Sequence, residues 1–160
     1  MDLSKVSHNV NLAKLDNARW LEYAYALTQG NSVSKEGMPK YRDECPACHW
    51  LYDHSEQMRS LYQKIDRSEI DLFHFDFMEQ IEILRYDLHE KYLQIFNIYY
   101  PELYNSFLAS LFRRSKRLSE NDRTDAHNHY REMQQIVNAL DNKLDYLEQS
   151  IDHLCSINSA

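Results

Sequence analysis

The chain has 160 residues, of which 43% are hydrophobic, and carries a formal net charge of −7. This length and apolar share indicate one globular domain with a core of its own and exclude a disordered chain. Only two glycines and three prolines occur, which is too few for the many tight turns of a β-rich domain. We therefore predict an all-α protein, a single domain over residues 1–160 that folds as an antiparallel bundle of four to five helices.

Charge and hydropathy also exclude several classes of function. Non-specific binding to nucleic acid needs a surplus of Lys and Arg, and this chain has a deficit. No run of about twenty apolar residues predicts a membrane span, and the first residues lack the apolar stretch of a signal peptide. We expect a cytoplasmic protein that binds neither nucleic acid nor membrane.

An apolar stripe near the N-terminus predicts the first helix. Its members follow one another at steps of three and four residues, which places them on one face of a helix. They are Val10, Ala13, Asn17, Trp20, Ala24 and Leu27. Asn17 is the polar member of this stripe, so we expect a structural role for it as a buried residue with a hydrogen-bonding partner. Gly30 then ends the helix.

The second and third helices carry histidines on their apolar stripes. Pro46 suits a first helical turn, with Cys45 at the cap position before it. The stripe that follows lies on one helix or on two short ones and comprises Ala47, Trp50, His54, Met58, Leu61 and Ile65. The third helix has a and d heptad positions at Ile70, His74, Phe77, Ile81, Leu84, Leu88 and Ile95, with Lys91 interrupting them.

Additional helices are predicted over residues 101–155, after Pro101 ends the third helix. The last of them carries a regular seam at Met133, Val137, Leu140, Leu144, Leu147, Ile151 and Leu154. Such a seam forms either one wall of a bundle or the contact between two copies. We therefore expect a protein partner and a homodimer. The residues predicted for the partner surface are Leu147, Ile151 and Phe75, which lies off the main stripe of its helix.

Two cysteines and two histidines form the strongest candidate site. In a reducing compartment, a C-x-x-C pair binds metal or carries redox chemistry more often than it forms a structural disulfide. Thiolates and imidazoles are the ligands that zinc prefers, so Cys45, Cys48, His54 and His74 are candidate zinc ligands. The alternative is that the histidines are core residues with hydrogen bonds to neighbouring helices. A thioredoxin-like redox motif is less favoured, because no strand is predicted before Cys45.

Three short motifs resemble those of the chemoreceptor zinc-binding (CZB) domain family. They are Asn17-Ala-Arg-Trp20, Cys45-Pro-Ala-Cys48-His49-Trp50 and Ile70-x-x-x-His74, in the family's order and near its spacing. The resemblance covers residues 12–81, with a CZB-like part over 12–98. It implies a small, dimerising helical module that reports zinc or an oxidant. A non-catalytic regulatory or sensory function follows from the resemblance.

The ligand set that this resemblance implies is incomplete. The family binds zinc through three histidines and one cysteine, which carry over to His74 and Cys45 here. Asn17 and Ile70 stand where the other two histidines belong, and Cys48 replaces a glycine. Either the site has lost its metal, or Cys48 or a neighbouring histidine has become a ligand.

Two enzyme classes find less support in the sequence. A HEPN-like ribonuclease would use an arginine and a histidine such as Arg123 and His129, but Thr124 after the arginine is atypical and no second acid–base pair is evident. A di-iron bundle needs Glu-x-x-His pairs, and no histidine here has a glutamate three residues before it. We predict that the protein is not an enzyme. A protein–protein adaptor or anti-regulator without metal is the alternative to the zinc module.

Overall fold

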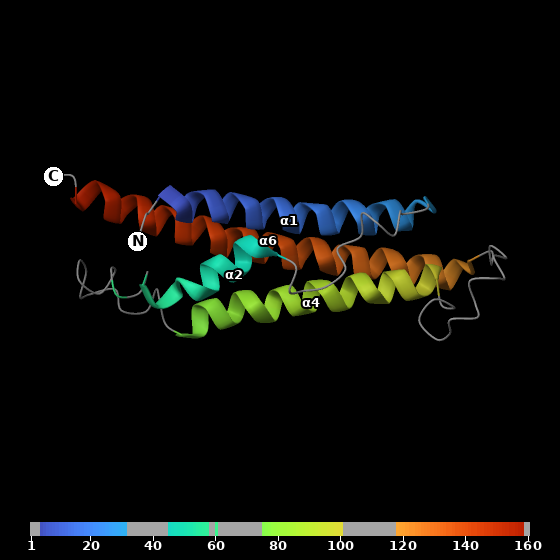
Figure 1. Ribbon diagram of the computed structural model, residues 1–160. Helices are drawn as coiled ribbons and strands as arrows, with labels where there is room; N and C mark the ends of the chain where they lie inside the picture. Colours follow the sequence, from blue (N-terminus) through green and yellow to red (C-terminus); the bar gives the residue numbers. More distant parts are fainter. Residues whose placement is uncertain (1–3, 32–44, 58–59, 61–74, 101–117, 159–160) are drawn as a thin grey trace.

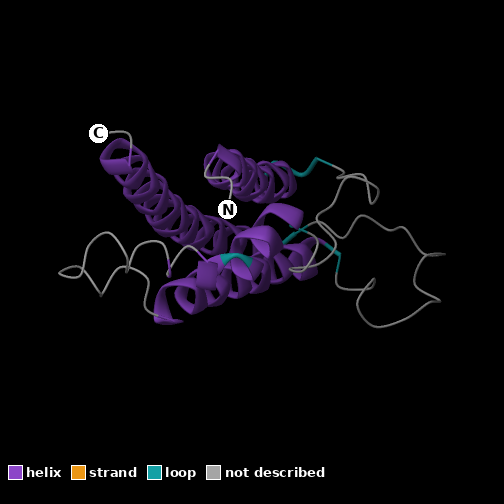
Figure 2. Cartoon of the chain, turned by 60° about the vertical axis from the view of Figure 1, so that its left-hand side comes forward, coloured by secondary structure: helices purple, strands orange, loops and turns teal. Residues whose placement is uncertain are grey.

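The computed structural model describes residues 4–31, 45–57, 60, 75–100 and 118–158. These residues form helices α1 (Ser4–Thr28), α2 (Pro46–Asp53), α4 (Phe75–Tyr99) and α6 (Glu120–Asn158) (Figure 1). No strand occurs among them (Figure 2). This confirms the predicted all-α fold. None of the described helices has a stretch both long and apolar enough to cross a membrane.

Helix α6 runs antiparallel to both α1 and α4, as the colour order in Figure 1 shows. Side-chain contacts establish these directions, because residues that come later in one helix meet residues that come earlier in the other. The pairs are Lys14–Asp145 and Tyr25–Tyr130 between α1 and α6, and Gln80–Lys143 and Lys91–Glu132 between α4 and α6. The antiparallel arrangement predicted from the sequence holds for these two helix pairs.

Helices α1 and α4 run in the same direction. Arg85 Nη2 lies 3.0 Å from Asp16 Oδ2, and Tyr99 Oη donates to the Thr28 carbonyl oxygen, 3.3 Å away, near the ends of both helices. The short helix α2 packs against α1 beside the long helices (Figure 2). Its N-terminus therefore lies close to the middle of α1, where Asp16 and Asn17 are found.

The core forms where the three long helices bury their apolar stripes. All six predicted members of the α1 stripe are buried, and so are five consecutive members of the α6 seam, from Met133 to Leu147. Burying a leucine or methionine side chain of this size stabilises the fold by about 1.5–3 kcal/mol. Burial of these two stripes accounts for the side-by-side packing of α1 and α6.

The register of α4 differs from the predicted one. Ile81, Leu88 and Ile95 are buried as predicted, but Leu84 is only half-buried. The neighbouring positions Arg85 and Tyr92 are buried instead, together with Met78. The inward face of α4 is thus rotated by about one residue toward Arg85, because that arginine finds polar partners inside the bundle.

Helix α6 begins with two reciprocal hydrogen bonds. The Ser119 Oγ accepts from the Asp122 backbone N–H at 3.1 Å, and Asp122 Oδ2 accepts from the Ser119 backbone N–H at 3.1 Å. This arrangement satisfies backbone donors that have no partner within the first turn of a helix. The acidic residues Glu120 and Asp122 also complement the positive end of the helix dipole.

Candidate functional site

Cys45 and Cys48 lie together at the N-terminus of α2. Cys45 is the N-cap residue and Pro46 occupies the first turn, as the sequence predicts. Cys45 Sγ accepts a hydrogen bond from the Cys48 backbone N–H at 3.3 Å. The two residues are not joined in a disulfide; Cys45 is buried and Cys48 is half-buried. The Cys48 N–H also donates to the Cys45 carbonyl oxygen at 3.1 Å, so Cys45 caps the first turn of α2 with both its sulfur and its backbone.

The two thiols have opposite acid–base behaviour. The hydrogen bond from the Cys48 thiol lowers the pKa of Cys45 to about 7, against the opposing effect of burial, and the positive charge of Arg85 acts in the same direction. The same hydrogen bond, together with burial, raises the pKa of Cys48. With a pKa of about 7, Cys45 is partly ionised near neutral pH, while the raised pKa of Cys48 keeps that thiol protonated, so a thiolate on Cys45 has a thiol beside it.

Arg85 connects this pair to α1. The side chain is 8% exposed, its Nη1 donates to Asn17 Oδ1 at 3.2 Å, and its Nη2 donates to Asp16 Oδ2 at 3.0 Å. Burial acts to lower the pKa of the guanidinium, but negative charge on the neighbouring cysteines when they ionise, together with the hydrogen bond and the charge of Asp16, outweighs burial and raises the pKa. Arg85 is therefore a buried cation surrounded by anionic and polar groups from α1 and α2.

Asn17 extends the polar contacts to α6. Its Nδ2 donates to Asp141 Oδ1 at 3.1 Å, while its Oδ1 accepts from Arg85. Both ends of the amide are thus hydrogen-bonded, which answers the sequence prediction that Asn17 needs a partner inside the bundle. One side chain of α1 thereby bridges α4 and α6.

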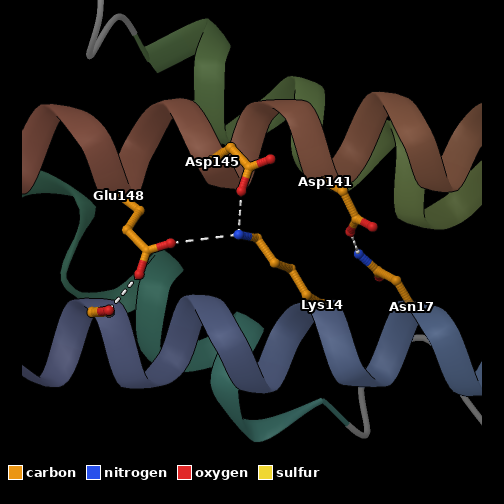
Figure 3. A network of polar contacts seen from close by, with 6 residues as sticks. Lys14, Asn17, Asp141, Asp145 and Glu148 are labelled. Carbon is orange, nitrogen blue, oxygen red and sulfur yellow. Dashed lines mark hydrogen bonds and ion pairs between the residues drawn. The ribbon is translucent and has the colours of Figure 1, made fainter.

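A row of ion pairs holds α1 against α6 next to Asn17 (Figure 3). Lys14 reaches between Asp145 and Glu148, with its Nζ 3.5 Å from Glu148 Oε2. Pairs at such partly exposed positions contribute about 0–1 kcal/mol each. Their effect at the site is mainly geometric, since they fix the register in which Asn17 meets Asp141.

A small cavity lies where α2 meets the long helices. Its volume is about 20 Å³, and its lining includes the polar side chains of Asn17, Cys48 and Arg85 among apolar neighbours from α1, α2, α4 and α6. A cavity needs about 10–15 Å³ to hold one water molecule. This space therefore accepts a molecule of about that size next to the Cys48 thiol and the Arg85 guanidinium.

The structure does not place either of the other two predicted zinc ligands, His54 and His74, beside Cys45 and Cys48. His54 is the C-cap of α2, where its Nδ1 lies 2.8 Å from the Trp50 carbonyl oxygen and its ring stacks on Trp50 with centroids 4.1 Å apart. It belongs to the opposite end of α2 from Cys45, because nine residues separate the two, which is about 13 Å along a helix axis. His74 lies outside the described residues.

The described residues alone do not complete a zinc site. Within the described part of the chain, no three side chains of Cys, His, Asp or Glu come together as metal ligands. Cys45 and Cys48 supply two ligands, whereas zinc sites in proteins use three or four. The positive charge beside the two thiols is that of Arg85. No step of the chemistry below is therefore assigned to a metal.

The residues predicted for a partner surface need one correction. Leu147 is 1% exposed and packs inside the bundle, so it is a core residue of the chain and not a partner contact. The apolar seam of α6 faces α1 and α4, which explains this burial. The side chains of Phe75 and Ile151 lie outside the described residues.

The arginine and histidine considered for a ribonuclease lie on α6 but in separate surroundings. Arg123 is exposed, and His129 Nδ1 lies 3.3 Å from Glu132 Oε2. Their positions are six residues apart on a continuous helix, which corresponds to a rotation of about 240° around the axis. The two side chains thus leave the helix in different directions.

Comparison with known proteins finds no family model, no curated protein and no solved structure that matches the chain.

Proposed function

We propose that this protein is a non-catalytic regulatory module that reports the oxidation state of the Cys45–Cys48 pair. The observation that carries the proposal is the arrangement of two cysteines at a helix N-terminus, where Cys45 Sγ accepts from the Cys48 backbone N–H and Cys48 lines the same small cavity as the buried Arg85. A thiolate with a lowered pKa and a second thiol within reach is what reversible disulfide formation requires. The resemblance to the CZB family supports a sensory role without supplying the metal.

The chemistry needs one oxidant, for which a hydroperoxide is sufficient. The Cys45 thiolate attacks the outer oxygen, the O–O bond breaks, and Cys45 becomes a sulfenic acid as the other oxygen leaves as hydroxide or alkoxide. The Cys48 thiol then attacks the sulfenic sulfur, forms the disulfide and releases water. Both sulfurs are oxidised and the peroxide is reduced, so atoms and electrons balance. A cellular dithiol restores the pair by exchange.

Oxidation changes the contacts of α2 in a defined way. A disulfide sulfur carries no negative charge, so Arg85 loses the thiolate beside it while keeping Asp16 and Asn17. The sulfur also becomes a weaker acceptor for the Cys48 N–H that it caps. The effect is smaller than the cost of complete loss of an N-cap, which is about 1 kcal/mol, because the Cys48 N–H also donates to the Cys45 carbonyl oxygen at 3.1 Å. We propose that α2 then loosens from α1, and that this change is the signal.

The chemical half of the proposal is tested by treating reduced protein with hydrogen peroxide under denaturant-free conditions. Peptide mapping without reductant follows the Cys45–Cys48 linkage in a Cys155→Ala background, which removes the third thiol. We expect the linked peptide in this background, a stable sulfenic acid on Cys45 in Cys48→Ser, and neither product in Cys45→Ser. Recovery of unmodified thiols from native protein, with ready oxidation of the unfolded chain, would contradict the proposal.

The alternative function is a protein–protein adaptor or anti-regulator without a small ligand. Apolar side chains on the outside of the bundle favour it: Leu15 is 58% exposed and Leu12 41% exposed on α1, and Ile83 is 53% exposed on α4. A homodimer would bury surface of this kind. Light scattering of wild type and of Leu15→Lys tests for a homodimer. A dimer that uses this face of α1 dissociates in Leu15→Lys and remains intact in the control Arg19→Lys.

A further inference from the structure

We infer that the Arg85 guanidinium holds the place of a metal cation beside the Cys45–Cys48 pair, so that the site works without metal. Zinc-binding modules anchor a thiolate from one helix to groups of other helices through a shared cation. Here Arg85, from α4, meets Asn17 and Asp16 of α1 and faces the same cavity as Cys48 of α2. One cationic side chain therefore joins the helices that a metal would otherwise join.

Space and charge at the cavity support this inference. The cavity holds about 20 Å³ and has Arg85 and Cys48 in its lining, which leaves room for about one water molecule. A zinc ion bound there by both cysteines would displace the Cys48 proton and so add one net positive charge next to a buried guanidinium, and like charges repel strongly where little water screens them. Arg85 and a metal ion thus exclude each other at this site.

The hydrogen-bonding capacity of Arg85 suits the role. A guanidinium has five N–H donors in a rigid plane. Two of its nitrogens donate to Asn17 and Asp16, which leaves donors for acceptors on the α2 side. A lysine has the same charge but lacks this planar fork, so it would keep the cation without the same connection to α1.

The charges around Arg85 are balanced by groups from three helices. Asp16 lies 3.0 Å from its Nη2, and Asp141 is connected through Asn17. Cys48 of α2 lines the same cavity as Arg85, and charge on the two cysteines acts to raise the pKa of the guanidinium. A buried arginine is stable only with such partners, and the partners include the two cysteines that the sequence points to as metal ligands. The inference concerns what fills the site and does not depend on the proposed redox signal.

The test replaces the cation by a ligand and measures zinc. Arg85→His removes the permanent charge and offers an imidazole next to Cys45 and Cys48, which gives three zinc ligands. Full-length reduced protein is titrated with zinc against a chromophoric chelator, for wild type, Arg85→His, Arg85→Lys and the control Arg19→His, which changes an exposed arginine of α1. Circular dichroism of each variant confirms that the helices are present.

We expect wild type, Arg85→Lys and Arg19→His to bind zinc equally weakly, and Arg85→His to bind it roughly tenfold or more tightly. Even a residue that only orients a metal ligand changes affinity by about 10–100-fold, so a new ligand gives at least that much. The gain should disappear in Arg85→His with Cys48→Ser. Tight binding of one zinc per chain by wild type would overturn the inference, as would a folded Arg85→His without any gain. If Arg85→His does not fold, the zinc affinities of wild type and Arg85→Lys provide the test. Tight zinc binding by either protein overturns the inference, and weak zinc binding by both supports it.

Discussion

Arg85 on α4 donates a hydrogen bond to Asn17 on α1 over 3.2 Å, and the same asparagine donates to Asp141 on α6 over 3.1 Å. These two hydrogen bonds form a chain of polar contacts from α4 through α1 to α6, in the middle of an apolar bundle. Both ends of the Asn17 amide form hydrogen bonds. The guanidinium of Arg85, from which its oxygen accepts, lies beside the Cys45–Cys48 pair. The stability of the bundle and the chemistry of the thiols therefore share one set of residues.

Replacing Asn17 with alanine should destabilise the fold by about 1–3 kcal/mol, because Arg85 and Asp141 each lose a partner at a buried position. Urea unfolding followed by circular dichroism measures this. The control is Asn11→Ala, at an exposed position of the same helix, which should change the free energy of unfolding by no more than about 0.5 kcal/mol. Equal effects of the two substitutions would show that the hydrogen bonds of Asn17 contribute nothing to the free energy of unfolding.

Tyr92→Phe should leave the stability unchanged or raise it by about 1 kcal/mol. The Tyr92 hydroxyl is buried without a hydrogen-bonding partner in the described part of the chain, and an unsatisfied buried hydroxyl is unfavourable. Tyr99→Phe is the matched comparison, since it removes the hydrogen bond to the Thr28 carbonyl and should lower the stability by about 0.5–1.5 kcal/mol. Thermal unfolding of both variants gives the comparison. A marked loss in Tyr92→Phe would mean that the hydroxyl has a partner in solution.

The rate at which iodoacetamide alkylates Cys45 should increase with pH around a midpoint near pH 7. Since the pKa is lowered to about 7, the thiolate fraction and the rate rise as the pH increases through that value and level off above it. An ordinary thiol shows this rise near about pH 8.5. Residue-specific rates come from mass spectrometry of quenched samples.

The variant Cys48→Ala provides the control for the alkylation profile. It removes the hydrogen bond that contributes most to the lowered pKa of Cys45, so the midpoint should move to higher pH. A wild-type midpoint at the value of an ordinary thiol would contradict the assigned hydrogen bond between the two side chains.

Ser119→Ala should cost about 1 kcal/mol, with a range of about 0.5–2 kcal/mol. The substitution removes the hydroxyl that caps the Asp122 N–H at the start of α6. Urea unfolding measures the loss, and hydrogen exchange should show faster exchange in the first turn of α6 only. Asn121→Ala, at an exposed neighbouring position, serves as the comparison and should have little effect.

The stripes of α1 and α6 could be predicted because their apolar residues recur at regular steps of three and four. The Cys45 cap could be predicted because Pro46 after it marks a first helical turn. In both cases the information is local in the sequence. The stripe that begins at Ala47 could be one helix or two short ones from the sequence, and α2 ends at Asp53. His54 stands nine residues after Cys45, which is about 13 Å along a helix axis, so it does not lie with the cysteines.

Arg85 was missed because a charged residue in a helix is expected on the surface. Its partners Asp16 and Asn17 are 69 and 68 residues away, and only the packing of α4 on α1 brings them together. The buried residues of α4 also follow one another at steps of three and four. They are Met78, Ile81, Arg85, Leu88, Tyr92 and Ile95. That regular spacing was the available signal. Leu147 was assigned to a partner surface because a seam sequence alone does not distinguish contacts within a chain from contacts between chains.

Hydrogen exchange of reduced and oxidised protein tests the central claim most directly. The account predicts that forming the Cys45–Cys48 disulfide makes the amides of α2, and those of α1 around Asn17, exchange faster, while the α6 amides far from the site keep their rates. Cys48→Ser treated in the same way should not reproduce the full change, because its disulfide cannot form. Identical exchange in the reduced and disulfide forms would contradict the claim that the state of this pair is transmitted to the bundle.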